Sequence, residues 1–311
     1  MTSFADWTVA DGEDGARLDH FVAAHAGCSH AAARRVVEGG AAKINGRRAK
    51  KGERLRKGDR VTVSGALPDA VSLRPIAQPE LPLEVLLLDE ECVALNKPAG
   101  IASHPLVAGE LGTLANALVA RYPECAGLGK DPREAGLAHR LDRDTSGVLL
   151  AARTPAAWEA LRASFSDGGV RKEYLALVSG VVTAPLVIAL PLAHDPRARR
   201  RVRVVGELDD GVEEARPART EVEPIASAGD LTLVRARAIT GRMHQVRAHL
   251  AHAGHPIVGD ALYGGGPLEG LTGHFLHAAR IAIATRGLDV RAPLPADRAA
   301  LLGRLGLPSD G

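Results

Sequence analysis

Residues 138–150, with the sequence AHRLDRDTSGVLL, place a cluster of charged side chains directly before an apolar run. Asp142 lies between Arg140 and Arg143, and the turn-forming residues 145–147 (TSG) separate the cluster from the apolar run. Short apolar runs bounded by turn residues are typical of buried strands. The stretch therefore predicts a charged loop that leads into a core strand. In this loop, nearby guanidinium groups can keep a carboxylate ionised.

The sequence on both sides of this stretch mixes strand and helix patterns without a regular alternation of the two. Apolar-polar alternation indicates strands, and apolar residues three or four apart indicate helices. This mixture favours an α+β fold around a mixed, mostly antiparallel sheet. Strands are expected in residues 83–97, 147–153, 170–182 and 231–240, and helices in 112–122, 154–167 and 245–254.

The region from Arg17 to Arg60 carries twelve Lys and Arg residues against four Asp and Glu, while the whole chain has a net charge of +2. It reads as two helices, the second capped by Ser29, followed by a small hairpin around an Asn45-Gly46 turn. This layout resembles the S4 domain, a small α/β RNA-binding module. The resemblance and the basic charge predict RNA binding. The candidate contacts are Arg34, Arg35, Arg47, Arg48, Lys50 and Lys51.

Residues 66–82 (ALPDAVSLRPIAQPELP) carry four prolines and little periodicity, which is typical of a linker. We therefore expect three parts in the chain. They are an S4-like domain over residues 1–66, a linker over 67–82 and a catalytic domain over 83–311.

Composition limits the remaining possibilities. Three cysteines lie far apart without a CxxC pair, which indicates buried thiols in a reducing compartment. No apolar segment approaches the roughly 20 residues that span a bilayer, and the acidic N-terminus lacks a signal pattern. The expectation is a cytoplasmic protein without a membrane partner.

Four motifs together resemble the RluA family of RNA pseudouridine synthases. They occur in the family's order and are spread over most of residues 82–295, and an S4 domain in front is a common arrangement in that family. The motifs are NKPAGIASHP (96–105), HRLDRDTSG (139–147), KEYLALVSG (172–180) and TGRMHQVRAHLAHAGHPIVGDALYG (240–264).

The resemblance implies roles for individual residues. Asp142 is the expected nucleophile, with Arg247 as its salt-bridge partner and Arg242 as the alternative, although Arg242 is assigned to substrate phosphate instead. Tyr174 is expected to stack on the uracil and assist proton transfer at C5, and Arg140 to fill the space of the flipped-out nucleotide. The other expected substrate contacts are His139, Lys172, His244 and Gln245.

The implied reaction turns uridine into pseudouridine. It breaks the N1–C1′ bond and joins C5 to C1′, so it needs no cofactor, metal or second substrate, and a carboxylate can carry it covalently. Whether Asp142 attacks C1′ or the uracil ring stays open. The expected partner is RNA, with ribosomal RNA favoured over tRNA because of the S4-like domain. DNA is not expected, and the chain is taken as a monomer.

Three alternatives compete with this interpretation. One is a non-catalytic RNA-binding or ribosome-assembly factor on the same fold. Another is a glycosidase, which would need a second carboxylate beside Asp142; Asp144 is the nearest. The third is a zinc site at the histidines of residues 244–255, which lack a HExxH pattern. The segment 191–217, with its arginine run at 197–203, is either a phosphate contact or a solvated hairpin.

Overall fold

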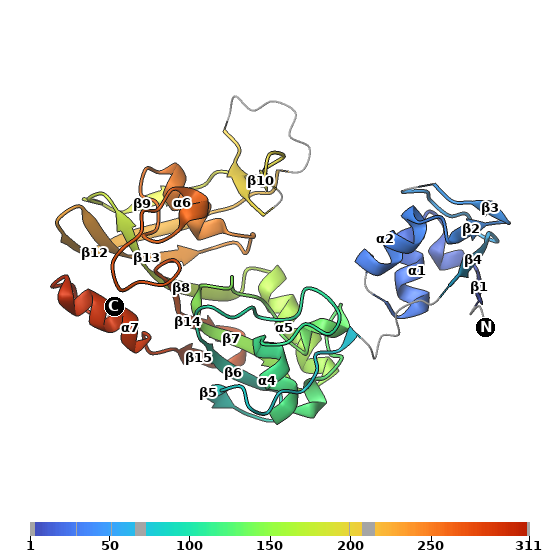
Figure 1. Ribbon diagram of the computed structural model, residues 1–311, viewed down its shortest axis with the longest axis horizontal. Coiled ribbons are helices and arrows are strands. Elements are labelled where there is room, and N and C mark those ends of the chain that lie inside the picture. Colours follow the sequence, from blue (N-terminus) through green and yellow to red (C-terminus); the bar gives the residue numbers. More distant parts are fainter. Residues whose placement is uncertain are drawn as a thin grey trace.

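The computed structural model describes residues 4–28, 30–50, 52–65, 73–198, 200–206 and 215–309 (Figure 1). Within them the chain forms a four-stranded sheet, a nine-stranded sheet and a two-stranded ribbon. The two larger sheets have separate apolar cores, and only the larger one carries the candidate site.

The N-terminal region folds as two helices followed by a hairpin, as predicted. Two helices, α1 (Leu18–Ala26) and α2 (His30–Glu38), pack on an antiparallel sheet of order β1-β4-β2-β3 (Figure 1). The predicted turn is confirmed, because Asn45 and Gly46 both have the positive φ that this hairpin turn requires. The strands are β1 (Phe4–Thr8), β2 (Ala42–Ile44), β3 (Arg47–Arg48) and β4 (Arg60–Ser64).

Strand β1 was not predicted. Its Trp7 pairs with Val61 of β4 and packs edge-on against Phe21 of α1. Residues 4–8 show no strand pattern of their own. The partners that order them lie far along the chain. Ser29, the expected helix cap, lies outside the described residues.

The large sheet has the order β5-β6-β7-β14-β8-β13-β12-β9, with β15 paired to β14. Every pair in it is antiparallel except β7 with β14, which confirms the predicted mixed and mostly antiparallel α+β fold. Its strands are β5 (Glu84–Leu88), β6 (Cys92–Lys97), β7 (Ser146–Ala152), β8 (Val170–Ser179), β9 (Leu186–Ile188), β12 (Thr220–Ala228), β13 (Leu231–Ala238), β14 (Leu276–Ile283) and β15 (Leu288–Arg291).

Strand β7 is buried along its whole length. Helix α5 (Pro155–Ser166) contributes to the core on the side of Leu150, and α4 (Leu114–Arg121) to the core on the side of Leu149. This two-sided cover explains why 147–152 is continuously apolar in sequence. At its start Gly147 has a φ of +116°, and a side chain there would meet the Ala278 carbonyl at 2.2 Å. Only glycine therefore allows the parallel pairing that begins directly after the Asp142 loop.

Two further helices pack against the other half of the sheet (Figure 1). Helix α6 (Gln245–His252) and the C-terminal α7 (Ala296–Arg304) share a core with β8 and β13. The ribbon of β10 (Leu192–His194) and β11 (Val202–Val204) lies beside α6. The described part of segment 191–217, whose role was left open, is therefore a hairpin next to α6, the helix that carries Arg247.

The described part of the expected linker contacts both regions. Leu73 is buried in the core of the N-terminal region, whereas Gln78 accepts a hydrogen bond from the Gly112 amide at 2.7 Å. Residues 66–72 lie outside the described part, so the limits at 66 and 82 stay a prediction.

Cys28, Cys92 and Cys125 are buried and unpaired, as the sequence predicted. Within the described ranges, no helix combines the length and the apolar character that a bilayer crossing requires.

Candidate active site

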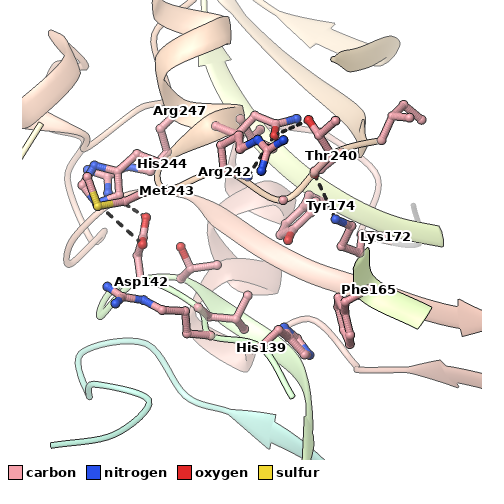
Figure 2. Close-up of a pocket in the computed structure, with 18 of the residues that line it drawn as sticks. His139, Asp142, Phe165, Lys172, Tyr174, Thr240, Arg242, Met243, His244 and Arg247 are labelled. Carbon is pink, nitrogen blue, oxygen red and sulfur yellow. Dashed lines mark hydrogen bonds and ion pairs between the residues drawn. The ribbon is translucent and has the colours of Figure 1, made fainter. Parts of the chain in front are cut away.

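One pocket of about 650 Å³ gathers the residues predicted for catalysis and substrate binding (Figure 2). Its lining comes from the loop before β7, the C-terminal part of α5, the strand β8, the turn between β13 and α6, and the start of β14. All nine predicted residues are in its lining: His139, Arg140, Asp142, Lys172, Tyr174, Arg242, His244, Gln245 and Arg247.

Asp142 is held by an arginine that lies 105 positions further along the chain. The Nη1 of Arg247 donates to Oδ2 of Asp142 at 2.8 Å. The same guanidinium donates Nε and Nη2 to the two carboxylate oxygens of Asp260, at 2.6 and 2.8 Å. Asp260 is only 2% exposed and Arg247 7%. This bidentate contact fixes the guanidinium plane and therefore the direction from which it meets Asp142.

The charge of Asp142 depends on two opposing effects. Burial raises the pKa of its carboxyl, while the nearby His244 and Arg247 lower it, and the lowering is larger. Burial also lowers the pKa of His244, so its imidazole is neutral near pH 7. Arg247 is then the permanently charged group that donates directly to Asp142. A partly buried carboxylate with 20% of its side chain exposed is thus available to a ligand in the pocket.

His244 stands at the start of α6 in a left-handed conformation, with φ 52° and ψ 20°. This conformation is costly for residues other than glycine and is found mostly where surroundings enforce it. Here it aims the ring at the pocket, with Nε2 3.6 Å from Oδ1 of Asp142 and Nδ1 3.1 Å from the Tyr263 hydroxyl. Figure 2 shows the side chains of His244 and Asp142 facing each other.

Tyr174 projects from β8 into the pocket between two small neighbours. The residues opposite it are Ala236 on β13 and Ala278 on β14, so the sheet leaves room for a ring beside its own. Burial raises the pKa of the phenol, and the Asp142 charge raises it further. The hydroxyl is therefore protonated at neutral pH. The ring offers an aromatic face on which a base can stack.

Besides Arg247, the pocket lining holds three cations that were predicted to contact the substrate. Arg140 is exposed and makes no hydrogen bond to another described residue, and Arg242 is exposed with its Nε donating to the Pro217 carbonyl at 3.1 Å. Lys172 donates from Nζ to the Thr240 carbonyl at 2.9 Å. Burial, with the charge of Arg242, lowers the pKa of Lys172 to about 8, so it is still charged at pH 7.

Two predicted substrate contacts have other partners. The side-chain amide of Gln245 is 4% exposed, donates to the Arg219 carbonyl and the Thr220 hydroxyl, and accepts from the Thr240 hydroxyl and the Arg242 amide. Its bonding capacity is filled, so it shapes the turn before α6 and is not free to bind a substrate.

His139 is the second of these. Its Nε2 accepts from the Leu150 amide at 3.1 Å, and its ring lies on Phe165 at 4.7 Å between centroids. Burial lowers the pKa of His139 to about 3. The neutral imidazole of His139 therefore links the Asp142 loop to β7 through this hydrogen bond, at the edge of the pocket.

Lys97 and Ser103 hold the Asp142 loop from the side away from the pocket. Both stand in the NKPAGIASHP motif, but no role was expected for either. Lys97 is fully buried, and its Nζ donates to the carbonyls of Pro98, Ile101 and Arg143 at 2.8 to 2.9 Å. Burial lowers the pKa of Lys97 to about 7. Ser103 donates to the Leu141 carbonyl at 2.8 Å and accepts from the Leu141 amide. The NKPAGIASHP motif therefore supports the Asp142 loop through hydrogen bonds to its backbone.

The remaining candidates lie elsewhere. Arg34 and Arg35 are on α2, Arg47 and Arg48 on β3, and Lys50 follows β3. All five are exposed, although Arg34 pairs with Glu38 and Arg47 with Glu53. Lys51 lies outside the described residues. Among the described residues, no three His, Cys, Asp or Glu side chains converge in a way that could hold a metal ion.

Together these groups form an ionised carboxylate at the base of a pocket, an aromatic face beside it and cations around it. Such a set suits a nucleotide, because the cations can bind phosphate and the ring can stack on a base. Asp144 is not in the lining; its side chain packs at Gly273. The described lining therefore has a single carboxylate.

Two family models match the chain. One, described as RNA pseudouridylate synthase, matches residues 91–252, and the other, described as S4 domain, matches residues 16–61. An uncharacterized RNA pseudouridine synthase of Chloroflexus aurantiacus is 38% identical over 297 residues, which cover 93% of this chain and 90% of that protein.

A further relative and a solved structure agree. The ribosomal large subunit pseudouridine synthase D of Xanthomonas campestris is 35% identical over 286 residues, which cover 86% of this chain and 82% of that protein. The solved structure of human RNA pseudouridylate synthase domain containing 4 matches with a TM-score of 0.60 and 25% identity, covering 72% of this chain and 94% of the human one.

Proposed function

The chain belongs to the RluA family of RNA pseudouridine synthases, and we propose that it isomerises specific uridines of large-subunit ribosomal RNA with Asp142 as the nucleophile. One observation carries the assignment of the nucleophile. Asp142 is the only carboxylate in the described lining of the pocket, and Arg247 holds it ionised there.

The reaction balances within one nucleotide. The N1–C1′ bond breaks, C5 bonds to C1′, the proton on C5 is lost and N1 gains one. Asp142 supplies an electron pair to the activated nucleotide and leaves it again, so no net oxidation occurs. Because the Tyr174 phenol is protonated, we assign it to stacking, and the carboxylate released from the nucleotide accepts the C5 proton.

The cations have separate parts in this proposal. Arg140, exposed and without a hydrogen-bonding partner among the described residues, takes the space that the flipped nucleotide leaves. Arg242 and Lys172 bind phosphate beside the pocket.

A glycosidase is the less favoured alternative. A retaining glycosidase needs two carboxyl groups about 5–5.5 Å apart across the bond that is cleaved. The second acid of the motif, Asp144, packs away from the pocket at Gly273. A non-catalytic RNA-binding protein would have no use for a carboxylate that a buried arginine keeps charged.

The substrate class is tested with unmodified transcripts of large-subunit RNA, small-subunit RNA and tRNA. The protein is incubated with each, without added metal, and pseudouridine is mapped by carbodiimide labelling and primer extension. We expect stops at discrete uridines of large-subunit RNA. Stops on tRNA alone would overturn the ribosomal assignment. Absence of stops on every transcript and on assembled ribosomal particles would favour the non-catalytic alternative.

The charge of Lys172 gives a pH dependence that can be measured. Its pKa is lowered, so the positive charge is present below pH 8 and is lost as the pH rises through about 8. We expect RNA affinity to weaken over this range, and the Lys172→Arg variant to bind with little change because arginine stays charged. Dissociation constants of the inactive Asp142→Asn protein between pH 6.5 and 9 measure binding alone. A parallel loss in the Lys172→Arg background would contradict the assignment.

The basic face of the N-terminal region predicts a salt dependence. Replacing Arg35, Arg48 and Lys50 together by Gln should weaken binding to all RNAs and flatten the slope of log affinity against log salt by about 0.7–0.9 for each phosphate that is no longer bound. The single-turnover rate at saturating enzyme should not change. Arg304→Gln, an exposed substitution on α7, is the control. An unchanged slope in the triple variant would remove this face from the RNA interface.

A further inference from the structure

Tyr263 connects the β10–β11 hairpin to the pocket. It ends a short 3-10 turn (Ala261–Tyr263) and is 7% exposed. Its hydroxyl accepts a hydrogen bond from the Val202 amide of β11 at 3.0 Å. The same hydroxyl donates toward the Val202 carbonyl at 3.2 Å, and its oxygen lies 3.1 Å from Nδ1 of His244. One phenol oxygen therefore bridges the hairpin backbone and the imidazole that faces Asp142.

The ring of Tyr263 makes a second connection. The guanidinium carbon of Arg247, which pairs with Asp142, lies 5.1 Å from the ring centroid. The guanidinium carbon of Arg201, in the hairpin, lies 5.2 Å from it. Both distances are within the range of cation–π attraction. The residue thus contacts both groups that face the Asp142 carboxylate, as well as the hairpin.

The direction of the hydrogen bonds follows from charge. The His244 ring is neutral, so only one of its nitrogens carries a proton. Nε2 faces the ionised Asp142 at 3.6 Å, and an N–H there is favoured over a lone pair that would oppose the carboxylate. Nδ1 must then accept, and its partner is the Tyr263 hydroxyl. The single phenol proton thus has two acceptors within reach, Nδ1 at 3.1 Å and the Val202 carbonyl at 3.2 Å, and the bond to Nδ1 is the one that favours Nε2–H toward Asp142.

We propose that Tyr263 is a positioning residue that sets the His244 tautomer and the Arg247 orientation, and so makes the chemical step depend on the β10–β11 hairpin. This inference rests on the proposed function for its effect on rate. The hairpin carries Arg197, Arg200 and Arg201 in the connection between its strands. RNA phosphates that bind these side chains act on the strand whose backbone holds the phenol. Binding at the hairpin and the readiness of Asp142 are thereby coupled.

The first test removes only the hydroxyl. In Tyr263→Phe we expect the single-turnover rate to fall about tenfold, the scale of one buried hydrogen bond, with the dissociation constant for RNA unchanged. Tyr122→Phe is a matched control. Tyr122 is also buried, two guanidinium groups lie 5.7 Å from its ring, and it is absent from the pocket lining. A wild-type rate in Tyr263→Phe, or an equal loss in Tyr122→Phe, would overturn the proposal.

The second test does not depend on activity. Long-range proton–nitrogen spectra of the folded protein report which imidazole nitrogen of His244 is protonated, with the signal assigned through His244→Gln. We expect protonation at Nε2 in the wild type and a mixture of tautomers in Tyr263→Phe. The same tautomer in both would overturn the role of the phenol even if the chain had no activity on any RNA. If the tautomer changes but no RNA is modified, the proposed function has failed and the positioning role has not.

The third test concerns the hairpin. Arg201→Gln removes the guanidinium at the Tyr263 ring, and we expect it to slow the single-turnover step. If the hairpin acts through Tyr263, the losses in Arg201→Gln and Tyr263→Phe combine to less than their product in the double variant. Losses that multiply fully would show that the hairpin does not act through this side chain.

Discussion

Asp142→Asn should abolish isomerisation while the protein still folds and binds RNA. Asparagine has the shape of aspartate but no charge, so the change removes the nucleophile and leaves the pocket intact. We expect the single-turnover rate to fall by about four orders of magnitude or more, the scale on which loss of a catalytic nucleophile acts. Carbodiimide mapping measures the rate, and filter binding measures the dissociation constant.

Asp144→Asn is the matched control for this experiment. It lies two positions away in the same loop, and its side chain packs at Gly273 outside the pocket lining. The same chemical change there should leave the rate within a few-fold of the wild type. If Asp142→Asn retained activity, or if both variants lost it equally, the effect would belong to the loop and not to a nucleophile.

Much of this fold was predictable because its signals are local. Alternating apolar residues identified β8 and β13, and the TSG turn followed by an apolar run identified β7. Several strands were not predicted, among them β12, β14 and β1, and β1 pairs with β4 across a long sequence separation. Five residues without a pattern of their own become a strand only because a partner edge is available.

The sequence predicted which residues line the candidate site, but it predicted their contacts with one another less well. Sequence resemblance left both Arg242 and Arg247 as partners for Asp142. Arg247 lies in the first turn of α6 and is buried, whereas Arg242 precedes the helix and binds the Pro217 carbonyl. The orientation of a helix in the fold decides between them, and sequence spacing does not contain it.

The residues to which the sequence assigned no role in the site are those that orient other side chains or support the Asp142 loop. Asp260 stands in a quoted motif, but its two bonds to Arg247 depend on a loop that returns to the N-terminal turn of α6. Lys97 looks like an ordinary charge after an apolar strand, and it is buried because three carbonyls converge on it. Gln245 shows the converse. It was expected to bind substrate because it is a polar residue in a motif, and the sequence does not reveal that its side-chain amide is fully hydrogen-bonded within the protein.

Removing Arg247 should have the second large effect, and it should act on stability and rate together. In Arg247→Met the carboxylate of Asp260, 2% exposed, loses its bidentate partner. An unpaired buried carboxylate of this kind costs about 3–5 kcal/mol in the free energy of unfolding. Asp142 loses the guanidinium that orients it, and we expect the rate at pH 7 to fall by about a hundredfold or more.

The double variant Arg247→Met/Asp260→Asn separates these two effects. Neutral asparagine no longer needs a cation, so urea unfolding should show most of the stability restored, while the rate stays low because Asp142 still lacks Arg247. The residual activity should also move with pH. In the wild type the pKa of Asp142 is lowered, so its ionised form persists to acidic pH. Without Arg247 one of the charges that lower this pKa is lost, so the pKa rises. On acidification the rate should therefore begin to fall at a higher pH than in the wild type. Recovery of both stability and rate in the double variant would show that Arg247 matters only for folding.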